Sequence, residues 1–412
     1  MTRTNRVVPV LFVFAMSAFL ATLTLSVEGQ TGATEAPAAF DNLTNGFVTQ
    51  ARFDAAKEAF EEREGLDDGL GPVYNAQSCT ECHQNPVTGG ISQITELRAG
   101  HLDGAGNFVD AAGGSLINDR AIDAAFQERV AGAENVRTFR VSTNVLGAGF
   151  VEAIDSNTLL AIANAQPGQS GGAIAGQFIQ VPVGEAPGQV RGGRFGWKNQ
   201  HASLLSFSGD AYLNEMGITS RLNPTDNTSV GRVVSDGVDD PEDVEDPITH
   251  DADIDLFARF MRATKAPPRD PVVAATAAAQ AGSTLFNQIV CNICHVRSIT
   301  TAAPGTSING GALTVHPALG NKIIHPLSDF LLHNIGTGDG IVQNGGQSTA
   351  NKLRTMPLWG TRTRDRHMHD GASLTFTDAI LRHAGEAATV TNRFRALSGT
   401  QQNQIVTFLQ SL

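Results

Sequence analysis

The chain has 412 residues, of which 41% are hydrophobic and only 6% are aromatic. Asp and Glu number 41 against 29 Lys and Arg, so the formal net charge is −12. This acidic balance argues against nucleic-acid binding and predicts a surface that attracts basic partners, and the length fits two modest domains after an N-terminal leader.

Residues 1–30 have the composition of an export signal. Arg3 and Arg6 precede an apolar run over residues 7–25, which is the order of a charged region and a hydrophobic region in a signal peptide. The run is also long enough to remain as a membrane anchor, and no clean Ala-x-Ala cleavage site follows. We therefore expect a periplasmic protein, with cleavage or anchoring both open. The small, polar residues 31–44 predict a flexible linker.

The first domain is predicted over residues 45–265. A helix is expected from Phe53 to Phe60, with Phe53, Ala56 and Phe60 on one face. Residues 91–194 are rich in glycine and weakly patterned, which predicts loops or a few strands and one helix near 121–130.

An acidic loop follows over residues 236–255, with no apolar periodicity. Solvated surface, binding of a calcium ion between the domains and docking of a basic partner are the alternatives for it. A short helix is expected over 255–263. The proline-rich residues 266–271 then break the chain and predict the domain boundary.

The second domain, over residues 266–412, repeats the plan of the first. An alanine-rich helix over 272–288 leads into the loops, and amphipathic helices over 373–383 and 398–412 close the domain. Strand signals are sparse. The sequence therefore predicts a mainly α fold with two domains and loop-rich insertions.

The motif Cys79-Thr80-Glu81-Cys82-His83 recurs as Cys291-Asn292-Ile293-Cys294-His295, and the two copies use every cysteine in the chain. Cys-x-x-Cys-His is typical of covalent c-type haem attachment, in which the histidine ligates the iron. A redox dithiol or half of a zinc site is the alternative, but no further cysteine pair completes a zinc site. We therefore expect two covalently bound haem c groups, one in each of two cytochrome c-like domains. Such attachment outside the cytoplasm agrees with the export signal.

Several segments resemble one protein family. They are Gly71–Ser78 before the first motif, Arg194–Trp197, Glu215-Met216-Gly217, Arg354–Gly360 and His369-Asp370-Gly371. Together they resemble the di-haem oxidoreductases, which are also called thiol oxidoreductases and are relatives of bacterial di-haem cytochrome c peroxidases and of MauG-type enzymes. The resemblance extends over about residues 53–412.

The resemblance implies that the N-terminal haem is open to peroxide and that the C-terminal haem is six-coordinate and passes electrons. Trp197 matches the tryptophan that lies between the two haems, and Glu215 matches the acid in the distal pocket of the open haem. His383 occupies the position of the second iron ligand of the C-terminal haem, where relatives carry Met or Tyr. A core aromatic, a surface carboxylate and a capping histidine are the respective alternatives.

Other residues are candidates for supporting roles. His367, His369, His325 and His333 match the wall of the haem pocket, while His201 and His101 are further candidates near the first haem. Met216 and Met356 are alternative thioether ligands, and Arg194, Arg354 and Arg362 are candidates for pairing with haem propionates.

The expected function is that of a periplasmic di-haem peroxidase, which reduces hydrogen peroxide with electrons from a small cytochrome or copper protein. A MauG-like oxidase of a protein or organic substrate is one alternative. A non-catalytic electron carrier is the other. In a carrier both irons are six-coordinate, whereas an open catalytic iron binds cyanide or peroxide.

Overall fold

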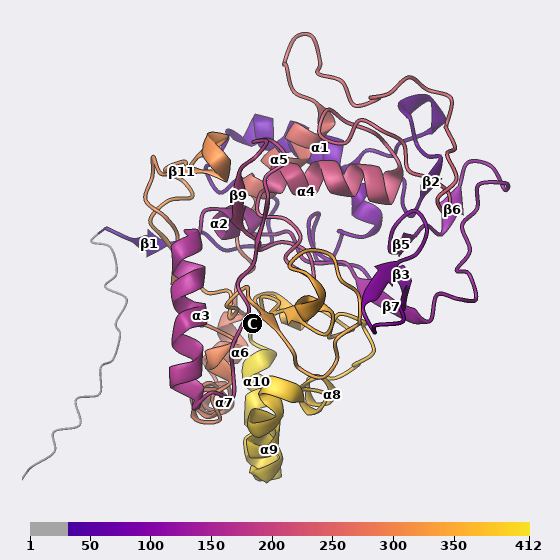
Figure 1. Ribbon diagram of the computed structural model, residues 1–412. Coiled ribbons are helices and arrows are strands. Elements are labelled where there is room, and N and C mark those ends of the chain that lie inside the picture. Colours follow the sequence, from indigo (N-terminus) through magenta and orange to yellow (C-terminus); the bar gives the residue numbers. More distant parts are fainter. Residues whose placement is uncertain (1–31) are drawn as a thin grey trace, which may run out of the picture. The chain divides into compact units, whose positions relative to one another are not determined.

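Two pairs of packed helices support the fold, one near each Cys-x-x-Cys-His motif (Figure 1). The computed structural model describes residues 32–412, so the predicted export signal lies outside the described residues. Within 32–412, no helix is both long enough and apolar enough to cross a membrane.

The first pair consists of α1 (Gln50–Glu61) and α5 (Asp253–Ala263). Thr49 caps α1, because its side chain accepts a hydrogen bond from the Arg52 amide. Phe53, Ala56 and Phe60 are the buried residues of α1, and the Phe60 ring lies 4.7 Å from that of Phe260 in α5. The predicted inward face of the first helix is confirmed.

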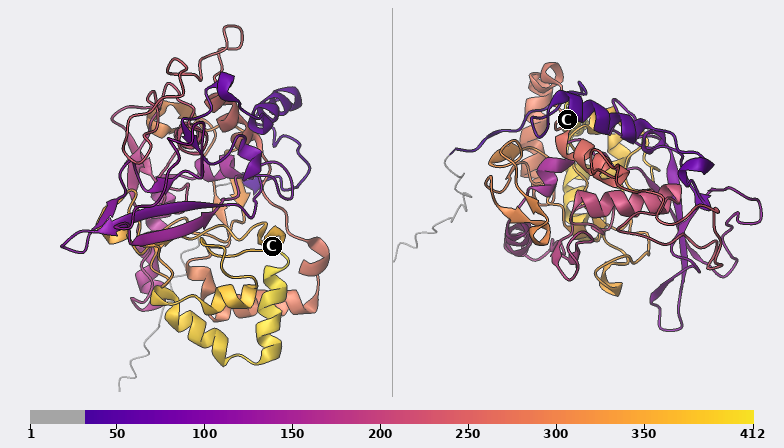
Figure 2. Two further views of the ribbon diagram at one scale, coloured as in Figure 1. Left: turned by 90° about the vertical axis from the view of Figure 1, so that its right-hand side faces the viewer. Right: turned by 90° about the horizontal axis from the view of Figure 1, so that it is seen from above.

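The second pair consists of α7 (Ala277–Gln288) and α10 (Gly399–Leu409), with α9 (Ala388–Ala396) beside them (Figure 2). The helix expected over 272–288 is interrupted, because α6 (Pro271–Ala274) ends before Thr276 caps α7. Phe286 of α7 packs against Phe408 of α10, with 5.3 Å between the ring centroids.

In each motif a phenylalanine lies beside the histidine, which supports the internal repeat. The Phe60 ring lies 6.2 Å from the His83 ring at an interplanar angle of 57°. The Phe286 ring lies 6.0 Å from the His295 ring, also at 57°. Each motif therefore follows a helix whose last turns carry a phenylalanine against the histidine.

A four-stranded antiparallel sheet occupies the segment that is weakly patterned in sequence. In it β3 (Thr95–Leu102) pairs with β7 (Val136–Val141) on one side, and with β4 (Phe108–Asp110) and β5 (Leu116–Ile117) on the other. The mainly α expectation therefore holds only in part, because this segment adds a sheet to the helices.

The helix predicted near 121–130 is wrong. Residues 122–130 form turns and extended chain instead. The Asp123 carboxylate accepts a hydrogen bond from the Ala125 amide, and the buried Glu128 carboxylate accepts from the amides of Asn118 and Val230. Side chains thus take backbone donors away from a helical ladder.

Further short elements connect these parts. Three helices lie between α1 and α5 in the chain: α2 (Ala148–Glu152), α3 (Ser156–Ser170) and α4 (Leu204–Ala211). Helix α4 continues into a wide turn, η3 (Tyr212–Met216). Helix α8 (Phe376–Leu381) precedes α9. Two-stranded pairs are formed by β2 (Val73–Tyr74) with β6 (Arg120–Ala121), β8 (Gln180–Pro182) with β9 (Val190–Gly192), β11 (Ser307–Ile308) with β12 (Leu313–Thr314), and β14 (Leu332–His333) with β15 (Leu353–Arg354).

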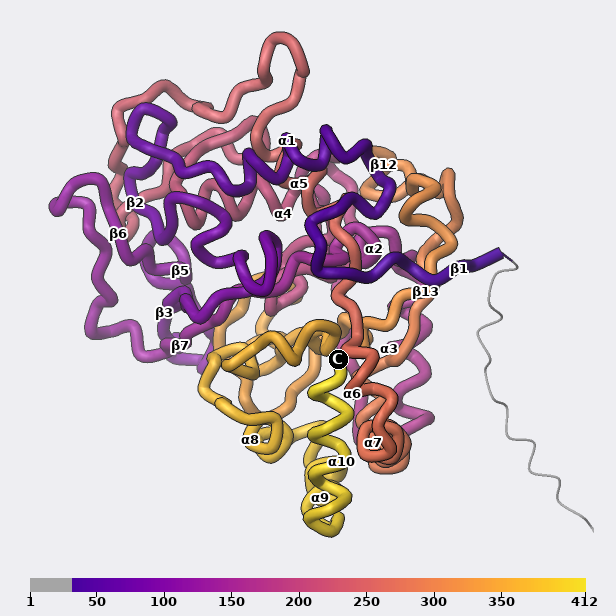
Figure 3. The backbone as a smooth tube through the Cα atoms, turned by 180° about the vertical axis from the view of Figure 1, so that it is seen from behind, coloured from indigo at the N-terminus to yellow at the C-terminus, as the bar shows by residue number. Residues whose placement is uncertain are grey.

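The N-terminal end of the described chain is built into a sheet with residues far along the sequence. Strand β1 (Thr34–Glu35) runs parallel to β13 (Lys322–Ile324), which also pairs with β10 (Ile299–Thr300) (Figure 3). Ala38 forms a bridge to Ala266. Residues 32–412 form a single compact unit, and the division at residue 265 stays a prediction.

Candidate functional site

Two large cavities contain the two motifs. The N-terminal cavity, of about 170 Å³, is lined by Cys79, Cys82 and His83 together with Glu96, Trp197 and Glu215. The C-terminal cavity, of about 200 Å³, is lined by Cys291, Cys294 and His295 together with Trp197 and His383. Each motif thus opens into its own cavity, and the other named site residues are distributed between the two.

A single tight turn positions each motif. The turns are η2 (Cys79–Glu81) and η4 (Cys291–Ile293), and in both the amide of the histidine donates to the carbonyl of the first cysteine at 3.0 Å. None of the four cysteines forms a disulfide. Both thiols and the imidazole of each motif therefore face the same space, as attachment of one flat group requires.

The two motif histidines are held as neutral imidazoles. Nδ1 of His83 lies 3.3 Å from the Gly90 carbonyl oxygen, and Nδ1 of His295 lies 3.0 Å from that of Leu327. Such a contact takes the proton on Nδ1 and leaves Nε2 free for a metal. Burial lowers the pKa of both histidines to about 4, so both are neutral at neutral pH.

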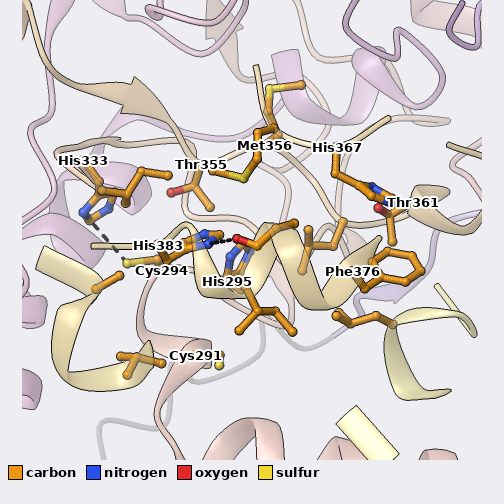
Figure 4. A pocket seen from close by; sticks show the side chains of 18 of the residues that line it. Cys291, Cys294, His295, His333, Thr355, Met356, Thr361, His367, Phe376 and His383 are labelled. Atoms are coloured by element: carbon orange, nitrogen blue, oxygen red, sulfur yellow. Dashed lines mark hydrogen bonds between the residues drawn. The ribbon is translucent and has the colours of Figure 1, made fainter. Parts of the chain in front are cut away.

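His383 lines the C-terminal cavity with His295 (Figure 4). Its Nδ1 donates to the Ala379 carbonyl oxygen at 2.7 Å; Ala379 lies in α8, and His383 follows the end of that helix. Burial lowers the pKa of His383, so this imidazole is also neutral with a free Nε2. The C-terminal cavity therefore contains two imidazoles that are chemically suited to ligate one iron.

Trp197 lines both cavities. Its Nε1 donates to the Val141 carbonyl oxygen at 2.8 Å, and its ring lies 6.1 Å from that of His369 in an edge arrangement. The indole is 7% exposed. Its position at the wall between the cavities matches the role that the family resemblance implies for it.

Glu215 lines the N-terminal cavity, on the wide turn η3. Nδ2 of Asn75 donates to Oε2 of Glu215 at 2.8 Å. Burial raises the pKa of Glu215, and the neighbouring Glu96 carboxylate raises it further. The sequence did not identify Glu96, although Glu96-x-Arg98 in a strand places two opposite charges on one face.

Within the described residues, two buried arginines of the C-terminal cavity have no carboxylate partner. Arg354, one of the sequence candidates, and Arg364, which the sequence did not indicate, both line this cavity. Within residues 32–412 neither forms an ion pair, and burial lowers the pKa of Arg354 to about 9 and of Arg364 to about 10. Buried cations of this kind fit the propionate groups of a haem. The donor set and these unpaired charges both fit a haem.

His333 lies beside Cys294 in a buried acidic cluster that the sequence did not indicate. Its Nε2 lies 2.8 Å from Asp329 Oδ2 and its Nδ1 lies 2.9 Å from Glu386 Oε2. Burial opposes a charge on His333, but the two carboxylates hold its pKa well above the usual value. A protonated His333 has no free lone pair for a metal.

The other candidates are divided between the cavities and the rest of the protein. His367, His369 and Met356 line the C-terminal cavity, and Met216 lines the N-terminal cavity. His325 contacts Glu35 at the surface, His101 contacts Glu134, and His201 contacts Asp210. Arg194 donates to backbone carbonyls, among them that of Ile154, and Arg362 donates to those of Pro268 and Leu412.

Carboxylates of the acidic loop approach each other outside both cavities. Oxygen atoms of Asp226, Asp240 and Glu242 lie within 4.8 Å of one another. Burial and the charges of Asp240, Asp236 and Glu242 raise the pKa of Asp226 to about 7. Exposed acidic groups also cluster without a metal, so calcium at this loop stays a prediction.

Comparison with known proteins gives one family and two similar structures. Residues 119–412 match the family described as "Di-haem oxidoreductase, putative peroxidase". Hydrazine synthase from Kuenenia stuttgartiensis, pressurized with xenon, is 13% identical over 99% of this chain and 100% of that chain, with a TM-score of 0.40. A MauG-like protein associated with microbial copper homeostasis is 14% identical over 92% of this chain and 93% of that chain, with a TM-score of 0.42. No curated protein sequence matches the chain.

The TM-scores of both structures are below 0.5, so we base no argument on them. The family match carries the assignment, since it spans more than half of the chain and includes Trp197, Glu215 and the second motif. The first motif precedes the matched residues, but it has the same local geometry as the second. The chain therefore belongs to the family of di-haem oxidoreductases.

Proposed function

We propose that the protein reduces hydrogen peroxide at the N-terminal cavity, with electrons that come from the C-terminal cavity. The observation that carries this proposal is the difference between the two cavities. Within residues 32–412, His83 is the only histidine that lines the N-terminal cavity, which also has three carboxyl groups, those of Glu96, Asp210 and Glu215. Five histidines, including His295 and His383, line the C-terminal cavity. The first cavity therefore has room for an exogenous ligand opposite its imidazole.

The cofactors in this proposal are two haem c groups, each bound through both thiols of its motif. Haem iron supplies a binding site for peroxide and one-electron chemistry, which no side chain of the protein provides. His83 and His295 would each ligate one iron, and Arg354 and Arg364 would neutralise propionates at the C-terminal cavity. His383 would be the second protein ligand of the C-terminal haem.

The protein's own contribution at the N-terminal cavity is proton movement. Reduction of peroxide needs a proton taken from one oxygen atom and a proton delivered to the other. Oε1 and Oε2 of Glu215 are the atoms that we assign to this task, because Asn75 fixes the carboxyl group at the cavity. Trp197, in the wall shared by the cavities, links the two sites.

We also propose that a small cytochrome or copper protein donates the electrons and that the protein acts in the periplasm. The net charge of −12 favours a basic donor. The composition of residues 1–30 favours export.

The experiment that tests the function compares wild type with Glu215→Gln, each with its haems attached. The variant should keep the visible spectrum and cyanide binding, because the carboxyl group is not an iron ligand. Its peroxide turnover should fall by about 10² or more, the usual scale for a positioned acid or base.

Glu64→Gln is the matched control. Glu64 is a buried glutamate that does not line the N-terminal cavity and pairs with Tyr212 instead, so turnover should be unchanged. If the wild type binds neither cyanide nor peroxide after its C-terminal haem is reduced, no open site exists. The protein is then an electron carrier.

A further inference from the structure

The strand β3 brings a second carboxyl group to the N-terminal cavity. Side chains alternate along a strand, so Glu96 and Arg98 share one face of the sheet. Arg140 lies directly opposite Glu96 in the neighbouring strand β7. All three side chains line the N-terminal cavity, and the sheet therefore presents a carboxyl group between two cationic guanidinium groups.

These charges fix Glu96 as a carboxylate. Arg98 binds both of its oxygens, with Nε at 2.6 Å from Oε1 and Nη2 at 3.2 Å from Oε2, and Nη1 of Arg140 lies 3.9 Å from Oε1. Asp339 holds Arg140 in place at 2.7 Å. Burial raises the pKa of Glu96, but the two arginines outweigh burial and hold it below the usual value.

Glu215 lines the same cavity as Glu96. The pKa of each carboxyl group responds to the other as to a hydrogen-bonding neighbour. Asn75 holds Glu215 at both ends, because its side chain donates to Oε2 and its amide donates to the Glu215 carbonyl oxygen. Two carboxyl groups can share a hydrogen bond only if one of them carries a proton.

We propose that Glu96 and Glu215 share a single proton, which Arg98 and Arg140 keep on Glu215 by holding Glu96 ionised. Glu96 is thus a positioning residue for the proton-transferring acid, and the inference rests on the proposed function. A pair with one proton is both an acid and a base. It accepts one proton from peroxide and returns one, so its own proton count is unchanged after each cycle.

Other titratable groups face the pair from the neighbouring elements. Asp210 of α4 adds a negative charge near Arg98, and His201 contacts Asp210 at 3.0 Å. The Cys82 sulfur is also near Glu215, but as a thioether to the attached haem it would carry no proton that titrates. Glu96 is therefore the negative charge that acts most strongly on Glu215.

Infrared spectroscopy of the haem-loaded protein tests the pair without any peroxide. Spectra over a pH series measure the carbonyl stretch of protonated carboxylic acids, and subtraction of the Glu215→Gln series isolates Glu215. In wild type the Glu215 signal should persist at neutral pH. In Glu96→Gln, the Glu215 signal is isolated by subtraction of the double variant Glu96→Gln/Glu215→Gln. This signal should disappear at a pH that is lower than in wild type by about 1 unit or more, the scale of one adjacent charge.

Two further variants sharpen the result. Glu96→Asp keeps the charge and should restore titration toward wild type, whereas Glu64→Gln should titrate Glu215 as wild type does. If Glu96→Gln does not fold, Arg98→Gln replaces it in the same titration. Loss of this cation should move the titration of the pair to higher pH. Unmoved titration in the folded variant overturns the proposal. A wild type without a protonated Glu215 at neutral pH also overturns it.

The outcome is separable from that of the proposed function. A wild type that consumes no peroxide but shows the shifted titration refutes the peroxidase and supports the proton-sharing pair. A wild type that consumes peroxide with an unmoved titration refutes the pair and leaves the peroxidase standing.

Discussion

His383 shows how local geometry prepares a side chain for one task. Its Nδ1 is fixed to the Ala379 carbonyl oxygen at 2.7 Å, and its free Nε2 shares a cavity with His295. The variant His383→Ala should convert one low-spin haem to high-spin, because the iron loses its second imidazole. Visible and electron paramagnetic resonance spectra of the purified protein measure this change.

His367→Ala is the control for that measurement. His367 lines the same cavity, but its ring packs against Phe376 at 4.5 Å, so its loss should leave both spin states as they are. A high-spin signal in His367→Ala and none in His383→Ala would transfer the ligand role to His367.

At the scale of single residues, the sequence predicted the features that depend on residues close together in the chain. The spacing of Cys79, Cys82 and His83 is enough to define a motif, and the second copy confirms it by repetition. Glu96 and Arg364 could not be found in this way, because their places in the two cavities depend on how distant elements pack together. The role of Glu96 depends on strand pairing, which places Arg140 opposite it, and on folding, which brings Glu215 into the same cavity.

At the scale of elements, the contact between α7 and α10 permits no added atom. A Cβ on Gly282 of α7 would lie 1.9 Å from the Gln404 carbonyl oxygen of α10. Gly282→Ala should therefore push the two helices apart and destabilise the protein by about 1–3 kcal/mol, the usual cost of overpacking. Thermal or urea unfolding followed by circular dichroism measures the loss.

Gly168→Ala is the matched helical control. Gly168 lies within α3, where an added Cβ meets nothing within 4 Å, so alanine should stabilise the protein by about 0.4–1 kcal/mol. Equal effects of the two substitutions would show that α7 and α10 are not in close contact.

Prediction of elements succeeded where periodicity is strong and local. The helices α1, α5 and α10 have clear apolar faces, and all three were predicted within a few residues of their observed bounds. The sheet was not placed, because three strands lie between β3 and its partner β7 in the chain and each short strand alone has a weak pattern. Helix α3 was missed, since its composition of Ala, Gln and Ser carries little amphipathic signal.

For the whole molecule, buried carboxyl groups predict an unusual dependence of stability on pH. Burial, and then the Asp253 charge, raises the pKa of Glu64 to about 7, although the Tyr212 hydroxyl opposes this shift. A carboxyl group with a raised folded-state pKa stabilises the fold at low pH, and this contribution is lost as the pH rises from the unfolded value toward the folded value. Glu215 acts in the same direction.

We therefore expect Glu64→Gln to gain stability relative to wild type as the pH rises from about 4.5 to 7, by at most about 1.4 kcal/mol per pH unit. Urea unfolding at several pH values measures the difference between the two proteins. Glu62→Gln, at an exposed neighbour, should show a smaller dependence. A constant difference between Glu64→Gln and wild type would show that the pKa of Glu64 is the same in the folded and unfolded states.

At the scale of the whole molecule, the sequence predicted the internal repeat but not the long-range contacts between its parts. Residues 34–39, expected to be a linker, form hydrogen bonds to residues 266 and 321–323. Nothing in their small, polar composition specifies such distant partners. Long-range pairing of this kind depends on the whole folded chain.

These long-range pairings also set the order in which the protein can fold during synthesis. The core around α1 cannot close until α5 has been made, and β1 has no partner until residues 322–324 emerge. Contacts so distant in sequence form late, because the chain between them must be ordered first. The Cys79 and Cys82 thiols therefore stay accessible while most of the polypeptide is still being made, which gives any enzyme that modifies them time to act before burial.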